Sequence, residues 1–127
     1  DLWEPAKLAL QVAALEADPQ CGYALGRTRF LVMEGAELPP GFERVDLAAE
    51  HVAPFPSVML ARRRLFDQVG LFEEHWSIAA DVEWFRRVYD RGIASTVVPQ
   101  VLLRRRIHGA NLSYRPPDPG AFRRELL

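Results

Sequence analysis

The sequence has little of several features that would narrow its class at once. Cys21 is its only cysteine, which excludes an intrachain disulfide framework and a zinc site built from several cysteines. No apolar run approaches the roughly 20 residues that span a bilayer, and no segment has the pattern of a signal peptide. The net charge is only −1, which argues against a generally basic nucleic-acid-binding protein. We therefore expect a cytoplasmic protein, either at the inner face of the membrane or away from it.

What remains is the composition of an ordinary globular domain. Hydrophobic residues make up 49% of the 127 residues and charged residues 26%, so residues 1–127 are expected to fold as a single domain. The charge is unevenly divided, because residues 1–56 are mainly acidic and residues 57–127 mainly basic. A site for an anion is therefore expected in the second half.

The first half predicts one helix and one strand. Pro5 and the spacing of Leu8, Val12 and Leu15 predict an amphipathic helix over residues 5–17. Residues 21–33 have the composition of a strand, with a bulge or bend expected at its glycines, and residues 34–56 are expected to be mostly irregular.

The second half alternates strands and helices. We expect a short strand over residues 57–61, a helix over 62–69 that ends at Gly70, and strands over 93–98 and 101–107 separated by Pro99. A longer helix is expected over 81–91, with Val82, Phe85 and Tyr89 on one face and two further apolar residues beside it. The tail from residue 115 is expected to be a loop before a short helical end. This alternation predicts an α/β domain with a mixed sheet and flanking helices.

The last predicted strand could carry an anion site. Alternation along it places Arg104, Arg106 and His108 on one face, whereas Arg105 takes the other. Guanidinium groups bind phosphate in bidentate fashion and imidazole can ligate a metal, so this strip suits a phosphate-bearing or metal-bearing ligand. The structural alternative is an exposed strand whose arginines are solvated or paired with carboxylates.

Three other groups of residues have both a structural and a functional interpretation. Asp81 at the start of the 81–91 helix is either an N-cap or a general base. Trp76 and Trp84 are either core residues or platforms for a sugar ring. The run Arg62–Arg64 stands at a helix start, where the dipole disfavours cations, so at least one of these arginines is expected to have an external partner.

Taken in order, these segments resemble the second half of a family 2 glycosyltransferase with the GT-A fold. The resemblance covers residues 1 to about 114. It rests on Asp1-Leu2-Trp3 with Lys7-Leu8 and Gln11; Met59 to Arg63 with Phe66 and Val69-Gly70-Leu71-Phe72; Asp81 to Phe85 with Arg87 and Gly92; and Arg106-Ile107-His108 with Asn111 and Ser113. The chain departs from the family at Ala80, where an acidic residue is usual, and in residues 54–57, which lack the usual glycine.

The resemblance implies a role for several residues. Asp1 matches the last aspartate of the Asp-x-Asp motif, which holds a divalent metal, Mg or Mn, on the diphosphate of a nucleotide-sugar donor. Asp81 matches the catalytic base, and His108 matches a histidine that approaches the metal or the diphosphate, with Arg106 beside it. The nucleotide-binding half would precede Asp1, so the resemblance implies a fragment of the fold that is inactive alone.

Two hypotheses about function follow. In the first, the chain is the acceptor-side portion of an inverting glycosyltransferase that uses a carbohydrate or lipid-linked acceptor. In the second, it is a non-catalytic binding or assembly module, which could form a homodimer through an exposed sheet edge.

Overall fold

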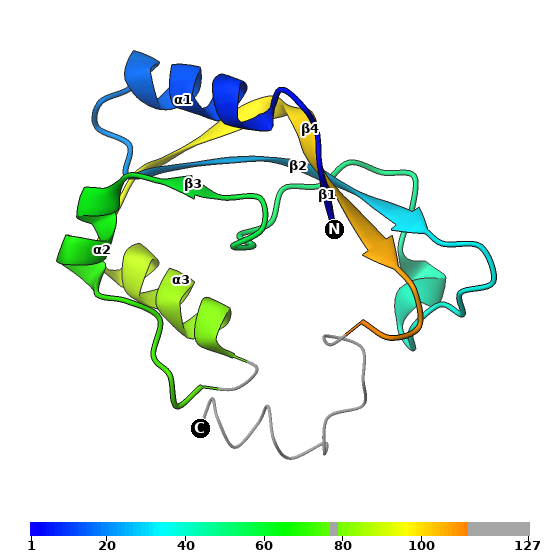
Figure 1. The fold of residues 1–127 in the computed structure, drawn as a ribbon. Coiled ribbons are helices and arrows are strands. Elements are labelled where there is room, and N and C mark those ends of the chain that lie inside the picture. The colour runs from blue at the N-terminus through cyan, green and yellow to red at the C-terminus, as the bar shows by residue number, and fades with distance from the viewer. Residues whose placement is uncertain (77–78, 112–127) are drawn as a thin grey trace.

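The computed structural model describes residues 1–76 and 79–111 of the chain and shows a mixed sheet with helices on both faces (Figure 1). The predicted tail from residue 115 lies outside these residues. Four strands form the sheet in the order β1-β4-β2-β3. The central strands β2 (Tyr23–Val32) and β4 (Ser95–Ile107) are parallel, and the outer strands β1 (Leu2–Trp3) and β3 (Leu60–Ala61) are antiparallel to their neighbours. The predicted α/β class with a mixed sheet is therefore confirmed.

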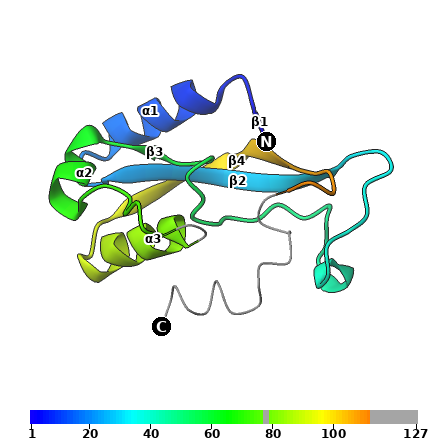
Figure 2. The same cartoon turned by 60° about the horizontal axis from the view of Figure 1, so that its bottom comes forward.

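Helix α1 (Lys7–Ala17) lies over one face of the sheet, and α3 (Ala80–Asp90) lies on the other (Figure 2). The short helix α2 (Arg63–Val69) packs beside α3, and a 3-10 turn, η1 (Phe42–Arg44), lies within the otherwise irregular 34–56 segment. The predicted positions of the three α-helices and of the long strand at residues 21–33 are confirmed. β1 was not predicted, because a two-residue strand has no periodicity of its own.

The predicted break at Pro99 is wrong, because β4 runs through it as one strand. Gly26 pairs with Val98, but the next residue of β2 pairs with Val101, so Pro99 and Gln100 lie in an irregularity of the register. A proline in that position removes no hydrogen bond from the ladder, since its residue has no partner across the strands. The bulge predicted at the glycines of the first strand is confirmed at Gly26.

Gly26 lies at this irregularity because the side chain of Leu102 fills the space beside it. A Cβ built on Gly26 would lie 2.3 Å from Leu102 Cδ1 and 2.9 Å from Leu102 Cβ. Leu102 is 1% exposed and belongs to a core cluster with Leu25, Val58 and Leu103. The glycine therefore allows a leucine of β4 to pack directly against the backbone of β2.

The predicted apolar face of α1 is only partly correct, because only Leu15 of its three residues is buried. Leu8 and Val12 are about half exposed, whereas Lys7, Gln11 and Leu15 are buried. Lys7 Nζ donates to Gln11 Oε1 at 2.8 Å and lies 4.2 Å from the centre of the Trp3 ring. The Gln11 amide donates in turn to the backbone oxygens of Ala24 and Val58, at 3.0 and 2.7 Å. A hydrogen-bonded polar group thus joins α1 to β2 and to the segment before β3.

The predicted face of α3 is only partly correct. Val82 is 48% exposed and Tyr89 80% exposed, whereas Trp84, Phe85 and Val88 are buried against α2 and the sheet. The Trp84 indole donates to the Gly70 carbonyl oxygen at 2.8 Å, which satisfies its only donor. Trp84 is therefore a core residue, as one of its two interpretations held.

The arginines at the start of α2 contact the end of α1. The Arg62 guanidinium donates to the carbonyl oxygens of Leu15 and Cys21, and Arg64 donates to that of Pro19 at 2.8 Å. Cations are favoured where the last carbonyls of a helix lack partners. Arg62 and Arg64 thus find acceptors in α1 and in the loop that follows it, and Arg63 and Arg64 are the exposed members of the run.

Candidate functional site

Asp81 lies in the first turn of α3 and is partly buried. It is not the N-cap, because Ala79 occupies that position and caps with no side chain. Asp81 Oδ1 accepts a hydrogen bond from the backbone N–H of Val82 at 2.8 Å. The N-cap interpretation is therefore wrong in detail, although the carboxylate does lie at the positive end of the helix dipole.

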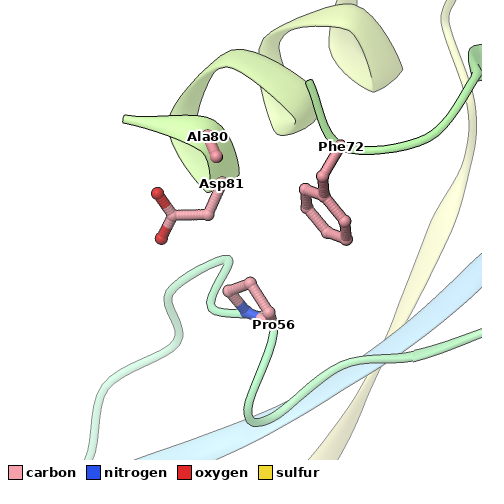
Figure 3. A pocket seen from close by; sticks show the side chains of 4 residues that line it. All are labelled: Pro56, Phe72, Ala80 and Asp81. Atoms are coloured by element: carbon pink, nitrogen blue, oxygen red, sulfur yellow. The ribbon is translucent and has the colours of Figure 1, made fainter. Parts of the chain in front are cut away.

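Asp81 borders an open hollow of about 400 Å³, which is also lined by Pro56, Phe72 and Ala80 (Figure 3). In this view Pro56 forms the floor, the ring of Phe72 stands on one side of it, and the carboxylate of Asp81 is directed to the other side. Three of the four lining side chains offer only carbon atoms. The hollow therefore combines an apolar surface with one carboxylate.

The floor of the hollow is attached to the strands β1 and β4. The Trp3 indole donates to the Ser57 carbonyl oxygen at 2.7 Å, which fixes the residue after Pro56 to β1. The Arg105 guanidinium lies 4.5 Å from the centre of the Phe55 ring, which fixes the residue before Pro56 to β4. Residues 55–57 thus lie between the first turn of α3 and the end of the sheet where β4 finishes.

Asp1 and His108 both lie at that end of the sheet. Leu2 pairs with Arg104, so Asp1 lies just beyond Arg104 along β4, and His108 directly follows β4. Both residues are exposed. The turn after β4 is fixed by Asn111, whose side-chain oxygen accepts from the His108 N–H and whose amide donates to the Arg106 carbonyl oxygen, each at 2.8 Å. Strand pairing therefore brings Asp1 and His108 to one end of β4. Pro56 lines the hollow beside Asp81, and its neighbours Phe55 and Ser57 contact Arg105 of β4 and Trp3 of β1.

The arginine strip follows the predicted alternation but does not form a free cationic surface. The β2–β4 register is regular from Leu103 to Ile107, so Arg104 and Arg106 share one face and Arg105 takes the other. Arg104 forms an ion pair with Glu4, as the structural alternative expects. Within the described part of the chain, the buried Arg106 Nε has no hydrogen-bond acceptor. Arg104 is therefore paired, whereas the buried Nε of Arg106 is a donor that lacks an acceptor among the described residues.

Asp1 supplies a carboxylate and His108 an imidazole, of which the carboxylate is the kind of ligand that Mg²⁺ prefers. Mg²⁺ is commonly held by one or two protein ligands together with substrate phosphates and water. Across residues 1–76 and 79–111, no group of three or more His, Cys, Asp or Glu side chains could hold a metal ion. The assignment of a metal to Asp1 and His108 therefore rests on the resemblance alone.

Phe72 is the residue of the hollow that sequence reasoning missed. The two tryptophans attracted the stacking interpretation, but Trp84 is buried and Phe72 is 36% exposed beside Asp81. The signal available in the sequence was its position two residues after Gly70, which ends α2 with a φ of 92° and turns the chain back toward α3.

Two further findings complete the description. None of the helices in the described ranges is both long enough and apolar enough to span a membrane. Comparisons of the chain with protein-family models, with curated proteins and with solved structures found no match.

Proposed function

We propose that this chain is the acceptor-side portion of an inverting glycosyltransferase that moves a sugar from a nucleotide-sugar donor to an acceptor hydroxyl. Asp81 is the general base, and Asp1, Arg106 and His108 bind the diphosphate of the donor or its metal. The nucleotide-binding part, which the resemblance to family 2 glycosyltransferases places before Asp1, belongs to the same proposal. So does a cytoplasmic location.

One observation carries the proposal. Asp81 borders a hollow whose floor, residues 55–57, is tied by Trp3 to the strand that follows Asp1 and by Arg105 to the strand that precedes His108. A carboxylate in reach of an open hollow is what deprotonation of a bound hydroxyl needs. Arg106 and His108, whose side chains can bind a diphosphate, lie at the end of the sheet where β4 finishes. Arg105 lies on the face of β4 that contacts this floor, so the proposal requires Arg106, on the other face, to reach the diphosphate past the end of the strand.

These positions support the following reaction. The acceptor oxygen attacks the anomeric carbon of the donor while its proton passes to the Asp81 carboxylate. A new C–O bond forms as the bond between the anomeric carbon and the diphosphate oxygen breaks, and the electron pair of that bond leaves with the nucleoside diphosphate. Cationic donors such as Arg106 stabilise the charge that develops there. When bound, a Mg or Mn ion would supply further charge neutralisation, with Asp1 and His108 among its ligands.

The proposal is tested by removing the base in the enzyme that includes the nucleotide-binding part. Asp81→Asn is expected to lower the rate of sugar transfer by about 10²- to 10⁴-fold, the usual contribution of a general base. Asp90→Asn is the matched control, because Asp90 lies at the other end of α3, is exposed and pairs only with Arg86 among the contacts described. Equal activity of D81N and D90N would show that Asp81 is not the base.

The 127-residue chain by itself is expected to transfer no sugar. Incubation with UDP-, GDP- and dTDP-sugars and a panel of acceptors, followed by detection of free nucleoside diphosphate, measures this. Turnover of any of these donors would contradict the division of the active site between two halves.

A second candidate, a binding or assembly module, is favoured by the edges of the sheet. β1 and β3 each contain two residues, so both cover only a short part of the long strands beside them. An unpaired strand edge is a site for pairing with a second copy. Light scattering during size-exclusion chromatography tests this candidate. A dimer that forms equally well in the unaltered chain and in D81N would favour the module, and a monomer at all concentrations would exclude the homodimer.

A further inference from the structure

The ring of Phe72 is held firmly in place from below. Its centre lies 5.1 Å from that of Trp84 and 6.3 Å from that of Phe66, and Trp84 is fully buried. The Arg87 guanidinium donates to the carbonyl oxygens of Val69 and Leu71, at 2.7 and 2.8 Å, and so fixes the backbone on both sides of Gly70. Arg87 is itself held by a two-point ion pair with Glu83. Phe72 thus has a preorganised position that needs no ordering when a ligand binds.

The exposed part of this ring lines the hollow together with Pro56 and Ala80 (Figure 3). Pro56 is part of a turn in which its carbonyl oxygen accepts from the Met59 N–H at 3.3 Å. Ala80 contributes a methyl group from the first turn of α3, where the family that the chain resembles usually has a carboxylate. The surface from Phe72 across Pro56 to Ala80 is therefore apolar, and the single charge on its border is Asp81.

This pairing of an aromatic face with one carboxylate matches one kind of ligand. The C–H face of a pyranose ring packs on an aromatic ring, and a ring hydroxyl can donate to a carboxylate. The described lining of the hollow contains no lysine or arginine, so it offers no cation for an anionic ligand. A uronic acid or a sugar phosphate would instead bring a second negative charge toward Asp81.

We infer that Phe72 is a specificity-determining residue: the acceptor is a neutral pyranose ring that stacks on Phe72 and Pro56 and directs one hydroxyl to Asp81. This inference rests on the proposed function, because it takes the hollow as the acceptor site. It selects a neutral sugar from the carbohydrate and lipid-linked acceptors that the resemblance leaves open. It also assigns the platform to Phe72 and not to Trp76 or Trp84.

Binding of the acceptor can be tested on the 127-residue chain without any donor. The ¹⁵N-labelled chain is titrated with neutral methyl pyranosides of the gluco, galacto and manno series, and with methyl glucuronide as the anionic counterpart. We expect at least one neutral pyranoside to shift the amide signals of Ala80 and Asp81, and the glucuronide to bind more weakly. No binding of any neutral pyranoside up to its solubility limit would overturn the inference.

Substitutions then test whether the Phe72 ring itself contributes to the affinity for the sugar. Phe72→Leu is expected to weaken the affinity about two- to tenfold, the usual worth of an aromatic contact, and Phe72→Trp to retain it. Tyr89→Leu is the matched control, since Tyr89 is an exposed aromatic residue on the outer face of α3. Should F72L fail to fold by circular dichroism, Pro56→Ala tests the same surface from the floor, with the same direction expected.

The outcomes distinguish this inference from the function on which it rests. Affinity that is equal in F72L, P56A and the unaltered chain overturns the platform, even when D81N abolishes transfer in the longer enzyme. Conversely, Phe72-dependent binding combined with full activity of D81N would leave the sugar platform in place and remove Asp81 as the base.

Discussion

Replacing Gly26 with alanine tests the packing between the two central strands. Gly26 has no positive φ, so alanine can adopt its backbone conformation, and the substitution would by itself stabilise the chain by about 0.4–1 kcal/mol through the unfolded state. The new Cβ, however, would lie 2.3, 2.5 and 2.9 Å from Cδ1, Cγ and Cβ of Leu102. Because the last of these atoms is next to the backbone, a change of rotamer cannot remove the clash.

The expected magnitude follows from these two opposing effects. Overpacking of a well-filled core costs about 1–3 kcal/mol. After the gain from the unfolded state is subtracted, G26A is expected to lower the free energy of unfolding by up to about 2.6 kcal/mol. Urea denaturation followed by far-UV circular dichroism measures this as a lower midpoint with an unchanged m-value.

A double-mutant cycle with Leu102→Ala identifies the cause. L102A alone is expected to cost about 2–5 kcal/mol, because the side chain is almost fully buried. In the L102A background the two shortest contacts, with Cδ1 and Cγ, are removed and only the 2.9 Å contact with the Cβ of residue 102 remains, so G26A should cost less than in the unaltered chain, with a coupling energy of about 0.5–3 kcal/mol. The reasoning is refuted if G26A stabilises the unaltered chain, or if it costs the same amount in both backgrounds.

Three further predictions concern the charged and polar core. Arg62→Ala should cost about 1.5–3 kcal/mol by urea denaturation because its guanidinium donates to the carbonyl oxygens of Leu15 and Cys21, whereas the exposed Arg63→Ala should stay within about 0.5 kcal/mol; equal effects would contradict the assignment. Burial lowers the pKa of Lys7 in the folded chain below its usual value of 10.5. Between the folded and the unfolded pKa the unfolded chain binds more protons, so the free energy of unfolding rises with pH in that range. Lys7→Met should remove that rise, and an unchanged slope would show that Lys7 does not cause it. Burial, reinforced by Asp18, raises the pKa of the Cys21 thiol, so its reaction with DTNB at pH 8 should require unfolding and follow the unfolding rate; rapid reaction in the folded chain would contradict this.

The sequence predicted well those elements whose signals are local. Gly70 ended α2, and the apolar spacing located α3. The buried face of α1 was not predictable in this way, because periodicity counts Lys7 and Gln11 as polar, and only the tertiary structure provides the carbonyl oxygens that Gln11 binds. The continuity of β4 through Pro99 was missed for a similar reason, since a bulge is a property of two strands together.

The candidate site shows the same division. The placement of Asp81 in the first turn of α3 follows from the sequence alone, and so does the alternation of Arg104 to Arg106. The pairing of Arg104 with Glu4 joins residues 100 positions apart, which no local pattern reports. Phe72 was missed because its neighbours in the hollow, Pro56 and Ala80, come from other segments of the chain.

The irregularity at Pro99 and Gln100 divides β4 into two stretches that keep separate registers with β2. The first stretch, Ser95–Val98, pairs with the beginning of β2 beside the core around α3, and the second, Leu103–Ile107, pairs with its end. Because the second stretch has its own pairs with β2, the arginines near His108 take the faces that those pairs dictate. The faces taken by the side chains near the candidate site are therefore set by the pairs of the second stretch and not by those of the first.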